Sequence, residues 1–339
     1  MFLRARKRCA VPVFRLKGSS VDGYTPVRIE QMVASFCTEG KLDPSLSYLS
    51  HIPVWKGVGF QDIMNLPSYY QTHAEMSLID VSLKNIVDQI LLELESGKRI
   101  RLWEFGPSKG NKTTRILIEL DRREVEFEYN GMDICLSDLD SFEASISGKL
   151  KPSSVVNLVW GDAPSFFANR EKSSDIVDVV LDFGGNVGNR DPIQSFLGDM
   201  RSQLKTGDLF LVGFHTRQPS PATILAAYND DEVTGQFIRN ALYQFGGLAN
   251  VTVYPQLFSY DSVIAADGTV VMGLVATRTH FMCFPKQEDP FEIRKGFTVT
   301  VSNSKKFRPL DFTKLMEGAG FIEKAGWINE SVGLRVYSI

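Results

Sequence analysis

The stretch WEFGPSKGNKTTRIL, which begins at Trp103, comes within one residue of a phosphate-binding loop. Such a loop has the pattern G-x-x-x-x-G-K-[ST], and its glycines let successive backbone N–H groups face the phosphates. Gly106, Lys112 and Thr113 fit this pattern, whereas Asn111 stands where the second glycine belongs. The loop therefore predicts a ligand site, but it has lost the glycine that a polyphosphate cradle needs.

Two nucleotide-binding interpretations of this region stay open as alternatives. The segment VDVVLD ends at Asp182 and resembles the apolar strand that carries a magnesium-binding aspartate in nucleotide triphosphatases. A nicotinamide fingerprint needs G-x-G-x-x-G, and GPSKGN supplies only Gly106 and Gly110. Because both patterns are incomplete, the sequence favours neither cofactor.

Acidic residues end three predicted strands in succession. Glu104 precedes the glycine turn, Asp133 ends the next strand and Asp162 closes the third. Ligands of open α/β sheets bind outside the carboxyl ends of the strands, where a carboxylate at the second position accepts ribose hydroxyls. Three carboxylates without a basic phosphate clamp suit a nucleoside that carries a cation. We therefore expect S-adenosylmethionine (SAM) as the cofactor.

The elements that must position these residues alternate between strand and helix. Such alternation predicts an α/β fold with a doubly wound, mostly parallel sheet and helices on both faces. An apolar pattern with helical spacing over residues 68–97 predicts a long helix, or a broken pair, before the first strand. The predicted strands are 99–106, 125–134, 154–162, 175–184 and 208–214, and the helices between them are 112–123, 136–147 and 192–204.

Beyond residue 214 the alternation gives way to a second region. Residues 221–248 are helical in pattern, whereas 250–261, 269–284 and 297–307 are strand-like, and a helix over 309–321 precedes a last strand. Residues 1–60 carry turn signals and are predicted to be irregular. We expect a Rossmann-like domain of residues 71–214 and 301–339. The predicted second domain is α+β, binds the substrate and comprises residues 1–70 and 215–300.

The composition excludes several classes of partner. The chain has 339 residues, 43% of them hydrophobic and 23% charged, with a net charge of -3, which does not fit a nucleic-acid binder. A short basic cluster at Arg4–Arg8 is predicted to be a solvated end. No apolar run reaches the roughly 18 residues of a membrane span, and the four cysteines and four histidines lack metal-ligand spacing. We expect a cytoplasmic monomer without metal, membrane or nucleic-acid partners.

Six motifs, in the same order, resemble a known family. They are LPSYYQTHAE, EFGPSKGNKTTRIL, GMDI with WGD, LDFGGNVGN, AAYNDDEVTGQFIRNAL and SNSKKF. From about residue 55 onward the chain resembles the histidine-specific Nα-methyltransferases of ergothioneine synthesis and their fungal relatives, which include the prenyl-tryptophan N-methyltransferases. The resemblance implies an enzyme that methylates the α-amine of a free amino acid and uses SAM.

The resemblance also implies roles for single residues. Tyr69, Asn189 and Tyr228 would hold the carboxylate and amine of the amino acid, which makes them the predicted catalytic residues. Ser302 and Ser304 would face the substrate's side chain. The remaining residues implied by the motifs are Met272 near that side chain and, around the cofactor, Gly106, Lys112, Asp133 and Asp162.

The chain departs from the family pattern at several positions. The second glycine of the loop is Ser108, and an aspartate that follows the strand LFLVGF is replaced by His215. The family's N-terminal tyrosine has no clear match, although Tyr48 or Trp55 could replace it. The largest departure is Ser302, because histidine-specific members carry at this position a glutamate that binds the imidazole.

This serine leads to a hypothesis about the substrate. A site built to hydrogen-bond a substrate group discriminates strongly, and a site that lacks the carboxylate does not. We therefore expect an aromatic amino acid, tryptophan first, with histidine or prenylated tryptophan as the alternative substrate. Methyl transfer then needs alignment of a neutral amine more than an obligatory catalytic base. An inactive, cofactor-binding partner subunit is the alternative outside enzymes.

Overall fold

The computed structural model describes residues 13–15, 24–49, 53–94, 98–151, 153–161, 167–285 and 287–339, with only the backbone for 13–15. The basic cluster at Arg4–Arg8 and the predicted cofactor residue Asp162 lie outside these residues. The helices are α1 (Pro26–Glu39), α2 (Phe60–Met64), α3 (Tyr70–Leu92), α4 (Thr113–Arg122), α5 (Leu136–Ile146), α7 (Ile193–Gln203), α8 (Pro221–Ala226), α9 (Thr234–Ala249) and α10 (Pro309–Gly318).

The strands of the large sheet are β1 (Val13–Arg15), β2 (Arg99–Phe105), β3 (Phe127–Asp133), β4 (Val155–Trp160), β5 (Ile176–Asp182), β6 (Leu209–His215), β12 (Ile322–Ile328) and β13 (Val332–Ser338). In the described part of the chain their order is β1-β4-β3-β2-β5-β6-β13-β12. The pairs from β1 to β6 are parallel, and β13 is antiparallel to both of its neighbours. The prediction of a doubly wound α/β sheet is confirmed.

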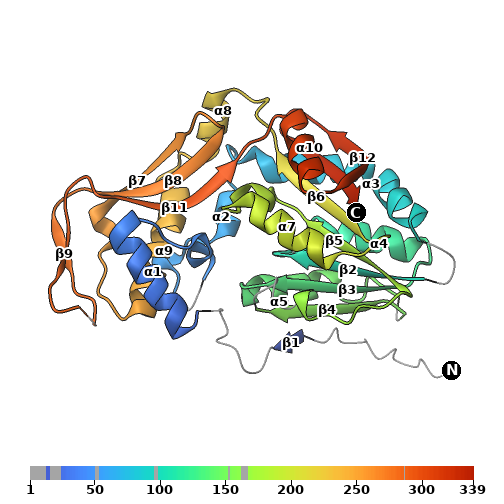
Figure 1. Ribbon diagram of the computed structural model, residues 1–339, viewed down its shortest axis with the longest axis horizontal. Helices are drawn as coiled ribbons and strands as arrows, with labels where there is room; N and C mark the ends of the chain where they lie inside the picture. Colours follow the sequence, from blue (N-terminus) through green and yellow to red (C-terminus); the bar gives the residue numbers. More distant parts are fainter. Residues whose placement is uncertain are drawn as a thin grey trace, which may run out of the picture.

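Helices cover both faces of this sheet because its central strands are apolar on both sides. All seven residues of β5 are buried, and so are all seven of β6. Along β2, Leu102 packs with α3, α4 and α5 on one face, and Trp103 packs with α7 and α10 on the other. This alternation is the two-residue period of a strand, and it makes the sheet the middle layer of the molecule (Figure 1).

A second region lies beside the large sheet (Figure 1). Its three-stranded antiparallel sheet has the order β11-β8-β7, from β7 (Phe258–Ile264), β8 (Thr269–Ala276) and β11 (Thr298–Lys305). Helices α1 and α9 pack against it, and one buried cluster joins residues 24–69 with residues 224–301. The remaining elements are the pair β9 (His280–Met282) and β10 (Phe291–Ile293), and the 3₁₀ turns η1 (Pro44–Tyr48), η2 (Trp55–Gly57), η3 (Asn186–Asn189) and η4 (Pro255–Leu257).

The prediction that residues 1–60 are irregular is wrong for α1. Thr25 caps this helix by accepting a hydrogen bond from the backbone N–H of Arg28, and Pro26 occupies the first helical position. Met32 and Phe36, four residues apart, are buried on the same face in the cluster of the second region. The turn signals on either side of α1 concealed this short amphipathic pattern.

Three further differences concern element limits. The helix after residue 68 is one continuous α3 rather than a broken pair. The strand-like segment 269–284 divides into β8 and β9, because the chain bends at Thr277 and Arg278. The expected domain limit at residue 300 falls inside β11, which continues to Lys305 in its pairing with β8. No helix of the described residues is long and apolar enough to cross a bilayer.

Candidate functional site

A cavity of about 650 Å³ opens at the carboxyl edge of the large sheet, where the second region faces it. Glu104, Asp133 and His215, at the ends of β2, β3 and β6, line it from the side of the sheet. Tyr48 and Met272 line it from the second region. Every predicted site residue that the structure describes lies on this wall: Tyr69, Glu104, Gly106, Lys112, Asp133, Asn189, Tyr228, Met272, Ser302 and Ser304.

The loop after β2 has a conformation that explains its sequence. Gly106 has a φ of 73°, a backbone conformation that glycine adopts without strain. Ser108, at the place of the family's second glycine, has a φ of 51° and keeps the glycine-like conformation with a side chain. Its backbone N–H donates to Asp133 Oδ2 at 2.9 Å, and its hydroxyl donates to Asp138 Oδ2 at 2.7 Å. These bonds offset the strain, so the loop keeps its shape although the glycine is missing.

Lys112 is not a free phosphate ligand. Its Nζ lies 2.6 Å from Oε2 of Glu75, a fully buried carboxylate on α3. The backbone N–H of Gly184 donates to both oxygens of the same carboxylate, at 3.0 and 2.9 Å. The lysine charge is thus neutralised within the protein, and a polyphosphate would have to compete with Glu75 for it.

Glu104 is a buried acid with only hydroxyl donors in hydrogen-bonding contact. Thr113 Oγ1 donates to its Oε2 at 2.5 Å, and Tyr129 Oη donates to the same oxygen at 2.6 Å. Burial raises the pKa of Glu104 to about 7, although the two hydroxyls and Lys112 oppose the shift. The carboxyl, which is 2% exposed, lines the cavity and can gain a full charge when a cation binds there.

Asp133 ends β3 and lines the cavity. Burial raises its pKa to about 6, while the backbone N–H groups of Cys135 and Ser108 oppose the shift by donating to its two oxygens. Gly161, which also lines the cavity, donates its N–H to the backbone oxygen of Asp133 at 3.1 Å. The carboxylate is thereby held at the edge of the sheet.

An aromatic group forms the opposite wall. The rings of Tyr69 and Tyr228 meet edge to face with centroids 5.9 Å apart, and Tyr48 meets Phe237 at 5.0 Å. Phe60 lies 6.2 Å from the Tyr69 ring. All five side chains line the cavity. The cavity lining therefore includes an aromatic surface of three tyrosines and two phenylalanines.

Asn189 has an amide oxygen without a partner. Its Oδ1 is buried and accepts no hydrogen bond from the described residues, although Asn189 lines the cavity. Asn189 does not cap the following helix either, because Pro192 is the N-cap of α7 and no side chain caps it. A buried acceptor without a donor is unfavourable unless a ligand supplies one.

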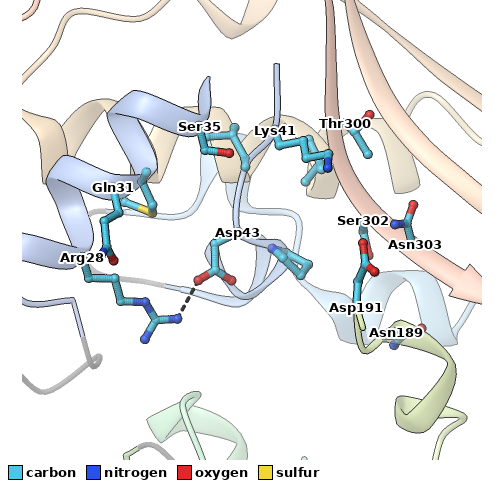
Figure 2. Close-up of a pocket in the computed structure, with 14 residues that line it drawn as sticks. Arg28, Gln31, Ser35, Lys41, Asp43, Asn189, Asp191, Thr300, Ser302 and Asn303 are labelled. Atoms are coloured by element: carbon cyan, nitrogen blue, oxygen red, sulfur yellow. Dashed lines mark hydrogen bonds and ion pairs between the residues drawn. The ribbon is translucent and has the colours of Figure 1, made fainter. Parts of the chain in front are cut away.

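Ser302 lies between two cavities. It and Asn189 line the large cavity and also a smaller one of about 350 Å³. Figure 2 shows Arg28 and Asp43 on one side of the smaller cavity, joined by an ion pair of 2.6 Å, and Ser302 on the other side. Asp191 and Lys41 also line it, so charged side chains share its wall with apolar ones such as Met32 and Leu42.

Sequence reasoning missed the residues behind Tyr228. Lys306, buried at 1% exposure, contacts Tyr228, Ser304 and His215. The signal was present, because Lys306 belongs to the SNSKKF motif, but no role was assigned to it. His215, which stands where the family pattern has an aspartate, is buried beside Lys306. Burial lowers the pKa of His215 well below its usual value, and Lys306 adds to the shift.

Of the two candidates for the family's N-terminal tyrosine, only Tyr48 lines the cavity. Tyr48 lines the cavity, whereas Trp55 donates its indole N–H to Gln236 on α9 and packs on Tyr243. Trp55 therefore joins η2 to α9 through this hydrogen bond and ring contact. Among the residues that the structure describes, no group of three or more His, Cys, Asp or Glu side chains could hold a metal ion.

Comparison with known proteins gives a family match and distant structural likenesses. A family model described as histidine-specific methyltransferase, SAM-dependent, matches residues 57–339. No curated protein matches the chain. One similar solved structure is the CcbJ methyltransferase from Streptomyces caelestis, with 12% sequence identity and a TM-score of 0.36; the match covers 81% of this chain and 97% of that chain. Another is the glycopeptide N-methyltransferase MtfA complexed with sinefungin, with 12% identity and a TM-score of 0.38; the match covers 95% of this chain and 99% of that chain. These values are too low to carry an argument about substrate.

Proposed function

Because the matching family model covers residues 57–339, the chain belongs to the histidine-specific, SAM-dependent methyltransferase family, and we propose that it methylates the α-amine of free L-tryptophan. That it is an enzyme and that it uses SAM follow from the family. The acceptor and the atom that receives the methyl group are our proposal. The aromatic wall beside Ser302 is the observation that carries it.

The residues present fit the cofactor. Gly106 leaves the backbone bare at the mouth of the loop, and the nearest atom to a Cβ placed there would be 3.7 Å away. Glu104 and Asp133 line the cavity without a lysine or arginine in ion-pair contact, so they are free to face an adenosyl group and a cation. SAM supplies an electrophilic methyl group on its sulfonium.

An aromatic amino acid suits the opposite wall. Tyr48, Phe60, Tyr69, Tyr228 and Phe237 would pack against an indole ring, and edge-to-face contacts of this kind favour aromatic partners. An indole also needs less hydrogen bonding than an imidazole. The pocket therefore has the chemistry for the larger and less polar ring.

Ser302 is the second support for tryptophan. The family's glutamate at this position binds an imidazole, and a serine cannot supply that charge. Removal of a buried carboxylate also removes the free energy needed to desolvate it beside an indole. Selectivity would then depend on shape and on the tyrosine hydroxyls.

Prenylated tryptophan and histidine are the alternative substrates. The space beyond Ser302 is the smaller cavity, whose wall includes the charged Arg28, Lys41, Asp43 and Asp191 and the apolar Met32, Leu42, Pro44 and Val301. An isoprenyl group placed there would meet both kinds of side chain, so the assay has to decide between the three acceptors.

The residues around the amine would act by positioning it. Asn189 Oδ1, which lacks a donor in the described structure, is suited to accept an N–H from the substrate amine. The rings of Tyr69 and Tyr228, which line the same cavity, meet edge to face. A neutral amine held about 3–3.5 Å from the methyl carbon is the arrangement that displacement requires. Model-peptide α-amines titrate near ~8, and a neighbouring cation lowers that value, so no obligatory base is needed.

The test is a methyl-transfer assay with tryptophan, histidine, phenylalanine, tyrosine and prenylated tryptophan. We expect tryptophan to have the highest kcat/KM, and fragmentation mass spectrometry to locate the new methyl group on the α-nitrogen. N-acetyltryptophan serves as a control that should not react. A higher kcat/KM for histidine, or a methyl group on the indole, would overturn the proposal.

A further inference from the structure

Lys306 is the one lysine below 9% exposure in the described part of the chain. Its Nζ lies 2.5 Å from Tyr228 Oη, 2.9 Å from Ser304 Oγ and 3.0 Å from His215 Nδ1. No described carboxylate lies within ion-pair distance of it, although buried charges are normally paired. The site therefore contains a buried basic group whose counter-ion is missing.

The hydroxyl groups around Lys306 show where that counter-ion would bind. Tyr228 Oη and Ser304 Oγ both lie within hydrogen-bonding distance of the Lys306 ammonium, and Tyr228 Oη also donates to Ser304 Oγ at 3.3 Å. Because Ser304 Oγ accepts these bonds, its own O–H points elsewhere, and the long Tyr228 bond can be exchanged for a bond to an anion. Both residues line the large cavity, so the two hydroxyls, backed by one cation, can donate to an anion that enters it.

We propose that Lys306 is a positioning residue whose charge holds the carboxylate of the amino-acid substrate through the hydroxyls of Tyr228 and Ser304. This assigns Ser304 to the carboxylate and replaces the expectation that it faces the substrate's side chain. The inference rests on the proposed function and adds to it the group that recognises the acid end of the substrate. The carboxylate supplies the counter-ion that the protein omits. Amino acids that lack a free carboxylate are then poor substrates.

The charged side chains near Lys306 in the described structure have other partners, so the substrate's carboxylate is left as its counter-ion. On α3 and the loop before α4, Glu75 is paired with Lys112, and at the exposed end of β11 Lys305 is paired with Asp267 at 3.2 Å. The guanidinium of Arg190, after η3, lies over the Phe196 ring. His215 shares its Nδ1 with Lys306 and is held neutral by burial, so it offers a lone pair and no negative charge.

Burial also makes the charge on Lys306 conditional. Desolvation lowers the pKa of Lys306 to about 7, so the empty site near pH 8 holds mostly the neutral amine. A bound carboxylate favours the ammonium form and raises the pKa again. Binding of the acid group is therefore expected to take up a proton.

The main experiment compares tryptophan with tryptophanamide, and histidine with histidinamide, by calorimetric titration of the SAH-bound enzyme. In Lys306→Met we expect the affinity for the acid to fall about 30-fold or more, and that for the amide to change less than about threefold. Lys305→Met is the matched control, because this neighbour lies on the opposite side of β11 and should leave both affinities unchanged. Retained SAH binding shows that the variants are folded.

The outcomes separate the two proposals. Equal losses for acid and amide in Lys306→Met mean that the lysine only supports packing, which overturns the inference and leaves the proposed function intact. The predicted difference found with histidine but not with tryptophan overturns the choice of tryptophan and supports the role of Lys306. Failure of the wild-type enzyme to bind any of these amino acids overturns both.

A measurement on the wild-type enzyme does not depend on the variant. Indole-3-propionate carries the carboxylate but no amine, so its binding isolates the acid end. Titration at pH 8 in buffers of different ionisation enthalpy should show uptake of a fraction of a proton, and none in His215→Asp, where a fixed carboxylate holds Lys306 charged. Absence of uptake in the wild type contradicts the inference.

Discussion

Glu104 and Ser302 show how single side chains set what each end of the cavity can bind. Glu104 meets only hydroxyl donors in the protein, so its charge depends on what enters the cavity. Ser302 lies where the two cavities meet and carries no charge at all. The Glu104 carboxyl can therefore gain charge beside a cation, whereas Ser302 adds no charge to the lining.

Replacement of Glu104 by Gln should weaken the binding of SAM more than the binding of its product, SAH. Burial raises the pKa of Glu104 to about 7, and the sulfonium of SAM favours the ionised form, so SAM binding near pH 6.5 releases a proton. In Glu104→Gln we expect this release to vanish and SAM affinity to fall about tenfold, while the affinity for SAH, which lacks the sulfonium charge, changes less than about twofold. Calorimetry in two buffers measures both effects, and exposed Glu126→Gln is the control.

Replacement of Ser302 by Glu should move the preference toward histidine. A carboxylate that hydrogen-bonds a substrate group is worth about 1.5–3 kcal/mol, which corresponds to a change of about 10–100-fold in relative kcat/KM. The assay is competition between tryptophan and histidine at equal concentration, with Thr298→Glu, at the exposed start of β11, as the control. An unchanged preference would show that Ser302 does not face the side chain.

At the scale of elements, loops and turns at the carboxyl edge supply most of the chemistry. The loop after β2 brings Gly106 and Ser108 against β3, and η3 presents Asn189 between the two cavities. Strand β11 and the residue that follows it bring Ser302, Ser304 and Lys306 from a second sheet to the same place. The sheet edge fixes one wall, and β11 fixes the other.

Loss of the Asn189 amide should impair turnover and spare cofactor binding. The side chain has a buried oxygen that awaits a donor and is suited to orient the amine. In Asn189→Ala we expect kcat/KM to fall about 100-fold or more, because misplacement by about 1 Å has effects of that size. SAH affinity, measured by calorimetry, should stay within about threefold. Wild-type rates would refute the positioning role.

The φ of 51° at Ser108 predicts an unusual order of stabilities. Ser108→Ala and Ser108→Gly both lose the hydroxyl that bonds Asp138, but only glycine removes the strained side chain. We expect the glycine variant to be more stable than the alanine variant by about 1 kcal/mol, the reverse of the order in a helix. Urea denaturation of the two variants measures the difference. Equal stabilities would contradict the left-handed conformation.

For the whole molecule, several buried acids concentrate at one edge of the sheet. Burial raises the pKa of Glu104 to about 7, and it raises those of Asp133 and Asp182 to about 6. Asp182 is fully buried, and neither of its oxygens has a hydrogen-bond partner in the described structure, which does not suit the metal-binding aspartate of a triphosphatase. The folded protein thus retains protons that the unfolded chain would release.

This retention gives a stability profile with a definite sign. Between about pH 5 and 7 the three acids bind more protons in the folded state than in the unfolded state, so their contribution to the free energy of unfolding falls as pH rises. His215, whose pKa is lowered, opposes them below pH 6.5, and Lys306, whose pKa burial lowers to about 7, opposes them near pH 7. We expect a net decrease on the order of 1–3 kcal/mol in the ligand-free protein, measured by urea denaturation, and a smaller decrease in Glu104→Gln. A rise over this range would contradict the shifts.

The sequence by itself determined the α/β class, the family and the cofactor. Strand and helix periods are local, and Glu104, Gly106 and Asp133 stand at strand ends that must meet at one edge of a parallel sheet. The motifs also pointed to Asn189, Tyr228 and Ser302, whose roles stay predictions although all three line the cavity. The proposed domain limits stay predictions too.

Only the tertiary structure decided how distant residues combine. Glu75 neutralises Lys112, and Lys306, directly after β11, meets His215 on β6, across sequence separations that no local pattern encodes. Burial, which requires the whole fold, shifts the pKa values and leaves Lys306 without an anion. Sequence spacing specifies neighbours along one element, whereas contacts between elements follow from how the apolar faces pack.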